Sequence, residues 1–263
     1  MARLPYLLAI PSGGTTIPRE LAPRFALTSE QLFFEIEAGA REIFSLGEGV
    51  QGRVEAEVAR AVIDLDRDPR QRPPEFPDGV IKSKSSLGHD VWTESGFPTP
   101  EEMERLVDRH HRPFHEVVER SASRGGVRLG LDCRVLVPMT ARDQDQAIFT
   151  LSNQGDAAGK GEEATCPAET LKFLEGCLLE EFSEVERSPL TPLVRLNGAV
   201  GGGYLLRRHG RGRTPWLQLA LNPRLFLTTE VTPEVVPEVD REVIASLRAR
   251  LVRVLTRFAE LLP

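Results

Sequence analysis

Cysteine, aromatic residues and long apolar runs are all scarce in this sequence. The three cysteines are odd in number and form no Cys-x-x-Cys pair, so neither a disulfide framework nor a cysteine zinc site is expected. No stretch approaches the roughly 18 to 20 apolar residues that a membrane-spanning helix needs. The segment before Pro11 is too short to hold a signal peptide. We therefore expect a cytoplasmic protein with no membrane partner.

The chain also lacks a surplus of basic residues. Its 33 lysines and arginines stand against 39 aspartates and glutamates, which gives a net charge of -6. Such a balance provides no overall attraction to a polyphosphate backbone. No nucleic-acid partner is expected.

The length of 263 residues and the apolar content of 40% suit a single large domain, 1–263, with a substantial core. Residues 6–10 form a short apolar run that stops at a Pro-Ser-Gly-Gly loop, which predicts a buried strand. Further strands are predicted at 58–65, 127–133 and 193–197, together with a pair formed by 204–207 and 216–221. Helical spacing predicts helices at 28–47, 100–118, 168–182 and 239–262.

This alternation of strands and helices predicts an α/β fold. We expect a mixed, largely parallel central sheet with helices on both faces and with function at the loops beyond the strand ends. Residues 69–98 contain five prolines, too many for regular elements, and this long connection is a candidate lid or substrate loop.

Five short motifs follow one another along the chain. They are Pro11-Ser12-Gly13-Gly14, Asp64-Leu65-Asp66-Arg67, Asp132-Cys133-Arg134, Asn197 followed by Gly201-Gly202-Gly203-Tyr204, and Gln218-Leu219-Ala220. In this order and spacing the set resembles the N-formylglutamate amidohydrolase family. The resemblance covers residues 7–227. It implies a phosphorylase/hydrolase-like fold similar to that of zinc carboxypeptidases, and substrates that are N-formyl or N-acyl amino acids.

The resemblance also implies a zinc site whose ligands have changed here. Ser12 and Arg134 stand where the family has histidine ligands, Glu37 matches an acidic ligand with Glu35 as the neighbouring choice, and Ala220 stands where the general base is expected. A hydroxyl is a poor zinc ligand at neutral pH and a guanidinium repels a cation. A catalytic zinc needs about three protein ligands. We therefore expect no metal and no other cofactor, and no residue is assigned a catalytic role.

Substrate-holding residues are better preserved. The Asp64 to Arg67 segment is similar to the family's Asp-Leu-Asn-Arg, and the fork of donors on Arg67 suits a substrate carboxylate. A salt bridge between Asp64 and Arg67 is the alternative. Asn197 with the following glycines resembles the family's Asn-x-Pro-Phe-x-Gly-Gly, with Ala199 and Val200 in place of Pro-Phe. A plain turn explains these glycines equally well.

Two other chemistries are compatible with the residues. His111, His115 and Glu119 share one helical face and offer a relocated metal site, with His110 close to them in sequence. His89 and His209 are expected as isolated residues on polar loops. Ser12 or Cys133 at a strand end offers a nucleophile with His115 as base, without a Gly-x-Ser-x-Gly elbow. Packing roles are the competing interpretation for these side chains.

Three hypotheses follow for function. The first is a family member whose pocket, formed by Ser12, Glu37, Asp64, Arg67, Arg134 and Asn197, binds an anionic small molecule or a peptide terminus without hydrolysis. The second is an active amidohydrolase with a rebuilt site, and the third is a non-catalytic protein that binds an unknown protein partner. We also expect Arg67 and Arg134 to face one cleft, and Arg134 to pair with Glu37 as a fixed cation in the metal's place.

Overall fold

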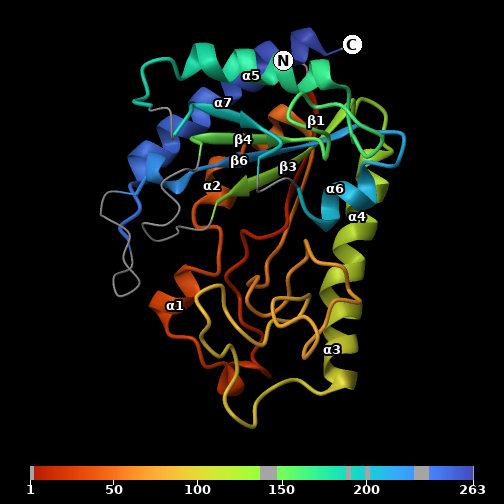
Figure 1. Ribbon diagram of the computed structural model, residues 1–263, viewed down its shortest axis with the longest axis vertical. Coiled ribbons are helices and arrows are strands. Elements are labelled where there is room, and N and C mark those ends of the chain that lie inside the picture. Colours follow the sequence, from red (N-terminus) through yellow and green to blue (C-terminus); the bar gives the residue numbers. More distant parts are fainter. Residues whose placement is uncertain (1–2, 137–146, 188–190, 199–201, 228–236, 263) are drawn as a thin grey trace.

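A six-stranded sheet forms the centre of the computed structural model, which describes residues 3–136, 147–187, 191–198, 202–227 and 237–262 (Figure 1). The strands lie in the order β2-β1-β3-β6-β4-β5, and all neighbours run parallel except β4 and β6. Their bounds are β1 Leu4–Ile10, β2 Val50–Glu55, β3 Leu129–Val135, β4 Phe149–Ser152, β5 Val194–Leu196 and β6 Trp216–Leu221. The predicted mixed, largely parallel sheet is confirmed.

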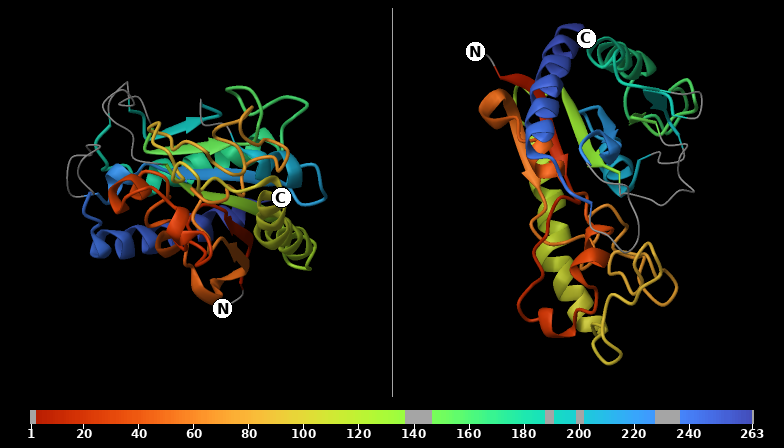
Figure 2. Two further views of the ribbon diagram at one scale, coloured as in Figure 1. Left: turned by 90° about the horizontal axis from the view of Figure 1, so that it is seen from below. Right: turned by 90° about the vertical axis from the view of Figure 1, so that its left-hand side faces the viewer.

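Helices cover both faces of the sheet, as predicted. Alternation along β1 sends Tyr6, Leu8 and Ile10 into one apolar cluster and Leu7 and Ala9 into another, because successive strand residues point to opposite faces. The first cluster includes α2 (Ala40–Ile43), α5 (Ala168–Glu181) and α7 (Arg241–Leu261), and the second includes α3 (Pro100–Leu106), α4 (Arg112–Ala122) and α6 (Tyr204–His209). The right-hand view of Figure 2 shows α7 (dark blue) alongside the strands and the helical column of α3 and α4 (yellow-green) extending below them.

Local sequence signals set several helix ends. Thr28 opens α1 (Ser29–Phe33) and Thr99 opens α3, each through a capping box in which its side chain accepts from the third helical residue. Pro113 does not break the predicted helix. A π-helical segment, Val107–His111, joins α3 to α4 just before it, and this widened turn accommodates the missing proline N–H.

Three predicted elements are wrong. Residues 58–65 form turns and an isolated bridge, and β2, which the sequence did not indicate, takes the place beside β1. Residues 204–207 begin the helix α6, so they form no hairpin with β6, whose neighbours are β3 and β4. The helix expected over 28–47 is divided into α1, which ends at Phe33, and α2, with turns between them and Gly39 at a left-handed φ of 78° just before α2.

The proline-rich segment 69–98 is irregular but partly packed. Val80, Ile81 and Trp92 are buried in the second apolar cluster, and the Trp92 indole donates to the Lys82 carbonyl at 2.7 Å. Its role as a lid stays a prediction, as does the assignment of one domain. None of the helices within the described ranges combines the length and the hydropathy that a membrane crossing requires.

Candidate functional site

The candidate site lies at the carboxyl ends of β1, β3 and β6, next to one another in the sheet. Asp132 pairs in register with Gln218, and Arg134 with Ala220. These residues alternate with core residues such as Cys133 and therefore share the sheet face that carries α4 and α6. Ser12 follows β1 directly. Parallel strands thus bring the motifs together at one edge.

Arg134 is the centre of this site. It is only 7% exposed, and every nitrogen of its guanidinium has a partner. Nε donates to Asp132 at 2.8 Å, Nη1 donates to the Ser12 hydroxyl at 2.8 Å and to Glu37 at 2.9 Å, and Nη2 pairs with Asp66. Three carboxylates and one hydroxyl therefore surround a single guanidinium. The expected ion pair between Arg134 and Glu37 is present.

Backbone groups fix the partners of Arg134. The second oxygen of Glu37 accepts from the Val135 N–H at 3.0 Å, and the Glu37 N–H donates to the Ser12 carbonyl at 3.2 Å. Asp66 Oδ1 accepts from the Leu205 N–H at 2.8 Å, at the start of α6, a favourable position for an anion. The carboxylates are thus held in place independently of the guanidinium between them.

Asp132 connects the site to β6. Its second oxygen accepts from Gln218 Nε2 at 3.1 Å, and Gln218 Oε1 accepts from the Gly202 N–H at 3.2 Å. Burial raises the pKa of Asp132 to about 7, although Arg134 opposes the shift. Burial likewise raises the pKa of Glu37 against the pull of Arg134. One guanidinium therefore does not fully compensate three carboxylates in this low-dielectric environment.

A second buried charge cluster adjoins the first. Asp64 accepts from Arg60 Nε at 2.8 Å and lies 4.0 Å from the ammonium of Lys82, which is fully buried and pairs with Asp78 and, at 3.5 Å, with Glu35. Burial disfavours the Asp64 carboxylate, yet Arg60 and Lys82 outweigh it and hold its pKa well below the usual range. No motif or periodicity indicated that Lys82 would be buried here.

The side chains present do not fit a zinc ion. Zinc binds carboxylate oxygens at about 2.0–2.2 Å, whereas the oxygens of Glu37 and Asp132 that face the centre of the site lie at hydrogen-bond distance from guanidinium nitrogens. The methyl group of Ala220, in register with Arg134, adds no ligand. Within the described ranges no group of three or more His, Cys, Asp or Glu side chains is placed to hold a metal ion.

Arg67 and Arg134 lie in different environments. Arg67 is part-exposed and directs Nη2 to Asp78, while its Nε lies 3.9 Å from Asp64. The alternative pairing of Arg67 with Asp64 is thus long, and Arg60 is the closer partner. Arg134, in contrast, is buried among carboxylates, and a common cleft for the two arginines stays a prediction.

Asn197 forms its hydrogen bonds with Ser152 at the end of β4 and with residues just after it. Its φ of 45° is left-handed. Its side chain accepts from the Ser152 hydroxyl at 2.9 Å and from the Asn153 N–H at 3.0 Å, and donates to the Asp156 carbonyl at 2.7 Å. None of these contacts is to Arg134. Ala199, Val200 and Gly201 lie outside the described residues.

The relocated metal site proposed for the histidines is not formed. His115 uses both ring nitrogens, one on the Leu65 carbonyl at 2.8 Å and the other on His209 at 2.9 Å. His111 contacts the Arg67 carbonyl at 2.9 Å. His209, which the sequence placed on a polar loop, is buried at the end of α6. Burial lowers the pKa of His115 to about 2 and that of His209 to about 4, so both are neutral at pH 7.

The nucleophile alternative is also disfavoured. Cys133 belongs to the apolar cluster on the opposite sheet face from Arg134, and burial raises its pKa well above the ordinary value. Ser12 accepts a hydrogen bond from Arg134, and His115 is engaged elsewhere. Asp66 and Asp132 are the partners of Arg134 that the sequence analysis did not assign to the site, although both lie in the quoted motifs.

Comparison with known proteins identifies the family and the fold. The family model described as N-formylglutamate amidohydrolase matches residues 4–227. A crystal structure of N-formylglutamate amidohydrolase from Ralstonia eutropha JMP134 is similar with a TM-score of 0.71 and 23% identity, over 99% of this chain and 94% of that one. A gene product from Agrobacterium tumefaciens is similar with a TM-score of 0.69 and 15% identity, over 100% and 92%. No curated protein sequence is a significant match.

Proposed function

Because the chain belongs to the N-formylglutamate amidohydrolase family, we propose that it is a member in which an internal arginine has replaced the catalytic metal. It binds an anionic small molecule or a peptide terminus and does not hydrolyse it. The observation that carries this proposal is the environment of Arg134, whose guanidinium is bonded to Glu37, Asp66, Asp132 and Ser12.

The chemistry of hydrolysis depends on groups that are missing from these positions. Attack on an amide needs an activated water and a group that accepts its proton. Ser12 and Ala220 supply neither, and the positive charge of Arg134 is permanent, so it activates no water by coordination. A fixed cation among carboxylates instead preserves the charge balance and the shape of the site.

Arg67 is the better candidate for anion binding. The donors of Arg134 are all engaged by protein groups, so a ligand carboxylate has no vacant N–H on it. Arg67 is 38% exposed, and within the described residues its Nη1 has no hydrogen bond. A part-exposed guanidinium with a free edge, one position after the Arg134 partner Asp66, suits a carboxylate.

Metal analysis of protein purified without chelators tests the proposal. We expect far less than one zinc per chain, and no chelator-sensitive hydrolysis of N-formylglutamate. About one equivalent of zinc with ordinary turnover would contradict the proposal and favour an active amidohydrolase with a rebuilt site.

Two matched variants sharpen this test. The triple change Ser12→His, Arg134→His and Ala220→Glu restores the residues expected of the family, and we expect it to gain zinc near one equivalent. The double change Ser12→His and Ala220→Glu keeps Arg134, and we expect it to stay metal-poor because the guanidinium repels the ion. Equal zinc in both variants would show that Arg134 does not take the metal's place.

A further inference from the structure

β2 is an edge strand with one open side. It pairs with β1 alone, at one end of the strand order, and the left-hand view of Figure 2 shows it (orange) at the outer margin of the sheet. An open edge offers unpaired N–H and C=O groups to another strand, and proteins usually guard it with proline, lysine or a bulge. Val50–Glu55 contains neither proline nor lysine, and its register with β1 is regular from Gly52 to Glu55.

Three residues of β2 direct their backbone groups outward. The Ala56 N–H donates to the Ile10 carbonyl of β1 at 2.9 Å. Successive strand residues direct their N–H and C=O groups to opposite sides in the plane of the sheet, so the even-numbered residues of β2 face β1 and the odd-numbered ones, Gln51, Arg53 and Glu55, face away from it. Among the described residues, no backbone hydrogen bond reaches these outward groups.

The charges of the outward residues complement themselves about Val54. In an antiparallel pair of two β2 strands, outward residues must oppose outward residues. A pair centred on Val54 places Arg53 opposite Glu55 of the second copy, and the two-fold symmetry repeats this contact. Centring the pair on Arg53 would oppose two guanidinium groups, which is destabilising. One register is therefore favoured, with two hydrogen-bonded residue pairs that are also pairs of opposite charge.

These two side chains are already part of a small charge network. Arg53 lies 3.5 Å from Glu55 of its own chain, and Arg41 of α2 pairs with Glu55 at 2.6 Å. The Arg53 side chain is 34% exposed, which leaves it room to contact a second copy. Exposed ion pairs contribute little by themselves, so their role here is to select the register.

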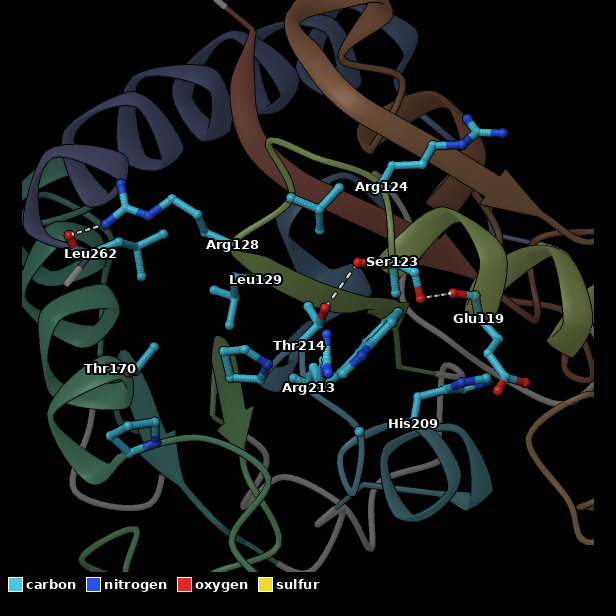
Figure 3. A pocket seen from close by; sticks show the side chains of 16 residues that line it. Glu119, Ser123, Arg124, Arg128, Leu129, Thr170, His209, Arg213, Thr214 and Leu262 are labelled. Atoms are coloured by element: carbon cyan, nitrogen blue, oxygen red, sulfur yellow. Dashed lines mark hydrogen bonds between the residues drawn. The ribbon is translucent and has the colours of Figure 1, made fainter.

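The other face of this edge is apolar. Val54 lines a groove of about 310 Å³ with Ala56, Val58, Phe114 and Val117, and Val117 on α4 is 38% exposed. A two-fold axis through Val54 brings two such grooves together on one face of the sheet, where burial of apolar surface is favourable. The larger cavity in Figure 3, at the start of β3 and β6, shares no lining residue with this groove.

From these features we infer that the open edge of β2 is an interaction surface for a second copy of this chain. The second copy adds its own β2 in the antiparallel direction, and the two six-stranded sheets become continuous. A second copy is the partner that fits because the charges of the edge are their own complement about Val54. This surface is separate from the Arg134 site and does not depend on the proposed function.

Sedimentation equilibrium of the full chain over a range of concentrations tests the inference. We expect a dimer for the parent chain. Arg53→Glu opposes two carboxylates across the interface and Glu55→Arg opposes two guanidinium groups, so each should raise the dimer Kd at least about tenfold, the equivalent of about 1.4 kcal/mol. The double variant Arg53→Glu with Glu55→Arg restores opposite charges and should return the Kd to near the parent value.

Two further variants separate pairing from folding. Arg53→Pro removes an outward N–H that no described residue accepts, so the monomer should fold, but the proline blocks strand addition and should abolish the dimer. Arg195→Glu makes the same charge change on β5, the strand at the other edge, and should leave the Kd unchanged. A parent chain that is monomeric at every concentration, a folded Arg53→Pro variant that still dimerises, or a folded double variant that associates no better than the single ones would each overturn the inference.

Discussion

Replacing Arg134 by alanine removes the cation that, among the described residues, is alone in direct contact with Glu37, Asp66 and Asp132. Breaking a buried ion pair by removing one partner typically costs about 3–5 kcal/mol, because the other charge is left uncompensated. Here three carboxylates lose the same partner. We therefore expect the free energy of unfolding to fall by about 3–5 kcal/mol at pH 8, which for a chain of this size lowers Tm by about 6–20 °C.

The loss should depend on pH. Arg134 lowers the pKa values of Glu37 and Asp132, which burial raises, so in its absence these two pKa values rise further above those of the unfolded chain and the protonated forms stabilise the folded state at low pH. Such a contribution is present below the unfolded pKa and is lost as pH rises through the folded pKa. The variant should therefore regain at least about half of the lost stability at pH 5. Glu37 and Asp132 already have raised pKa values in the parent.

Urea unfolding of parent and variant at pH 5 and pH 8 measures both effects. Arg67→Ala is the control, since this part-exposed arginine should cost less than about 1 kcal/mol at either pH. Combining Arg134→Ala with Glu37→Gln should cost less than the sum of the single changes. An Arg134→Ala variant within about 1 kcal/mol of the parent at pH 8, or one equally unstable at both values, would refute the substitute-cation argument.

Three further outcomes are expected. Asp132→Asn should make the free energy of unfolding less dependent on pH between pH 4 and pH 7. Because the pKa of Asp132 is raised to about 7 in the folded chain, its contribution to stability is present below the unfolded pKa and is lost as pH rises through the folded pKa. Unchanged pH dependence in urea unfolding would count against this. Gly130→Ala should cost about 1–3 kcal/mol, because a methyl group there would lie 2.2 Å from the Trp216 ring; a Tm equal to the parent's would contradict that packing. His209→Phe should reduce acid sensitivity below pH 6.5, because the folded pKa of about 4 gives stability that is present above the unfolded pKa and lost as pH falls; an unaltered acid transition would argue against a buried neutral His209.

Helix prediction succeeded where the signal is local. The apolar repeat of α5 and the helix start at Thr28 both depend on residues within a few positions of the helix that they define, so reading along the chain finds them. Residues 58–65 show the limit of this approach. Their apolar run resembles a buried strand, but it is used for packing in turns beneath α3 and α4, because burial alone does not distinguish a strand from a packed loop.

The sequence by itself determined which side chains stand at the motif positions, and from them came the proposal that these positions bind no zinc. Ser12, Arg134 and Ala220 carry no imidazole or carboxylate, and an arginine near Glu37 already indicated an ion pair. Only the tertiary structure decided what surrounds that arginine. Glu37 lies 97 residues from Arg134 and Ser12 lies 122 residues from it, so their contact depends on the order and register of β1, β3 and β6. The same holds for buried Lys82 and for the pair of His115 and His209, because partners distant along the chain leave no periodic signal.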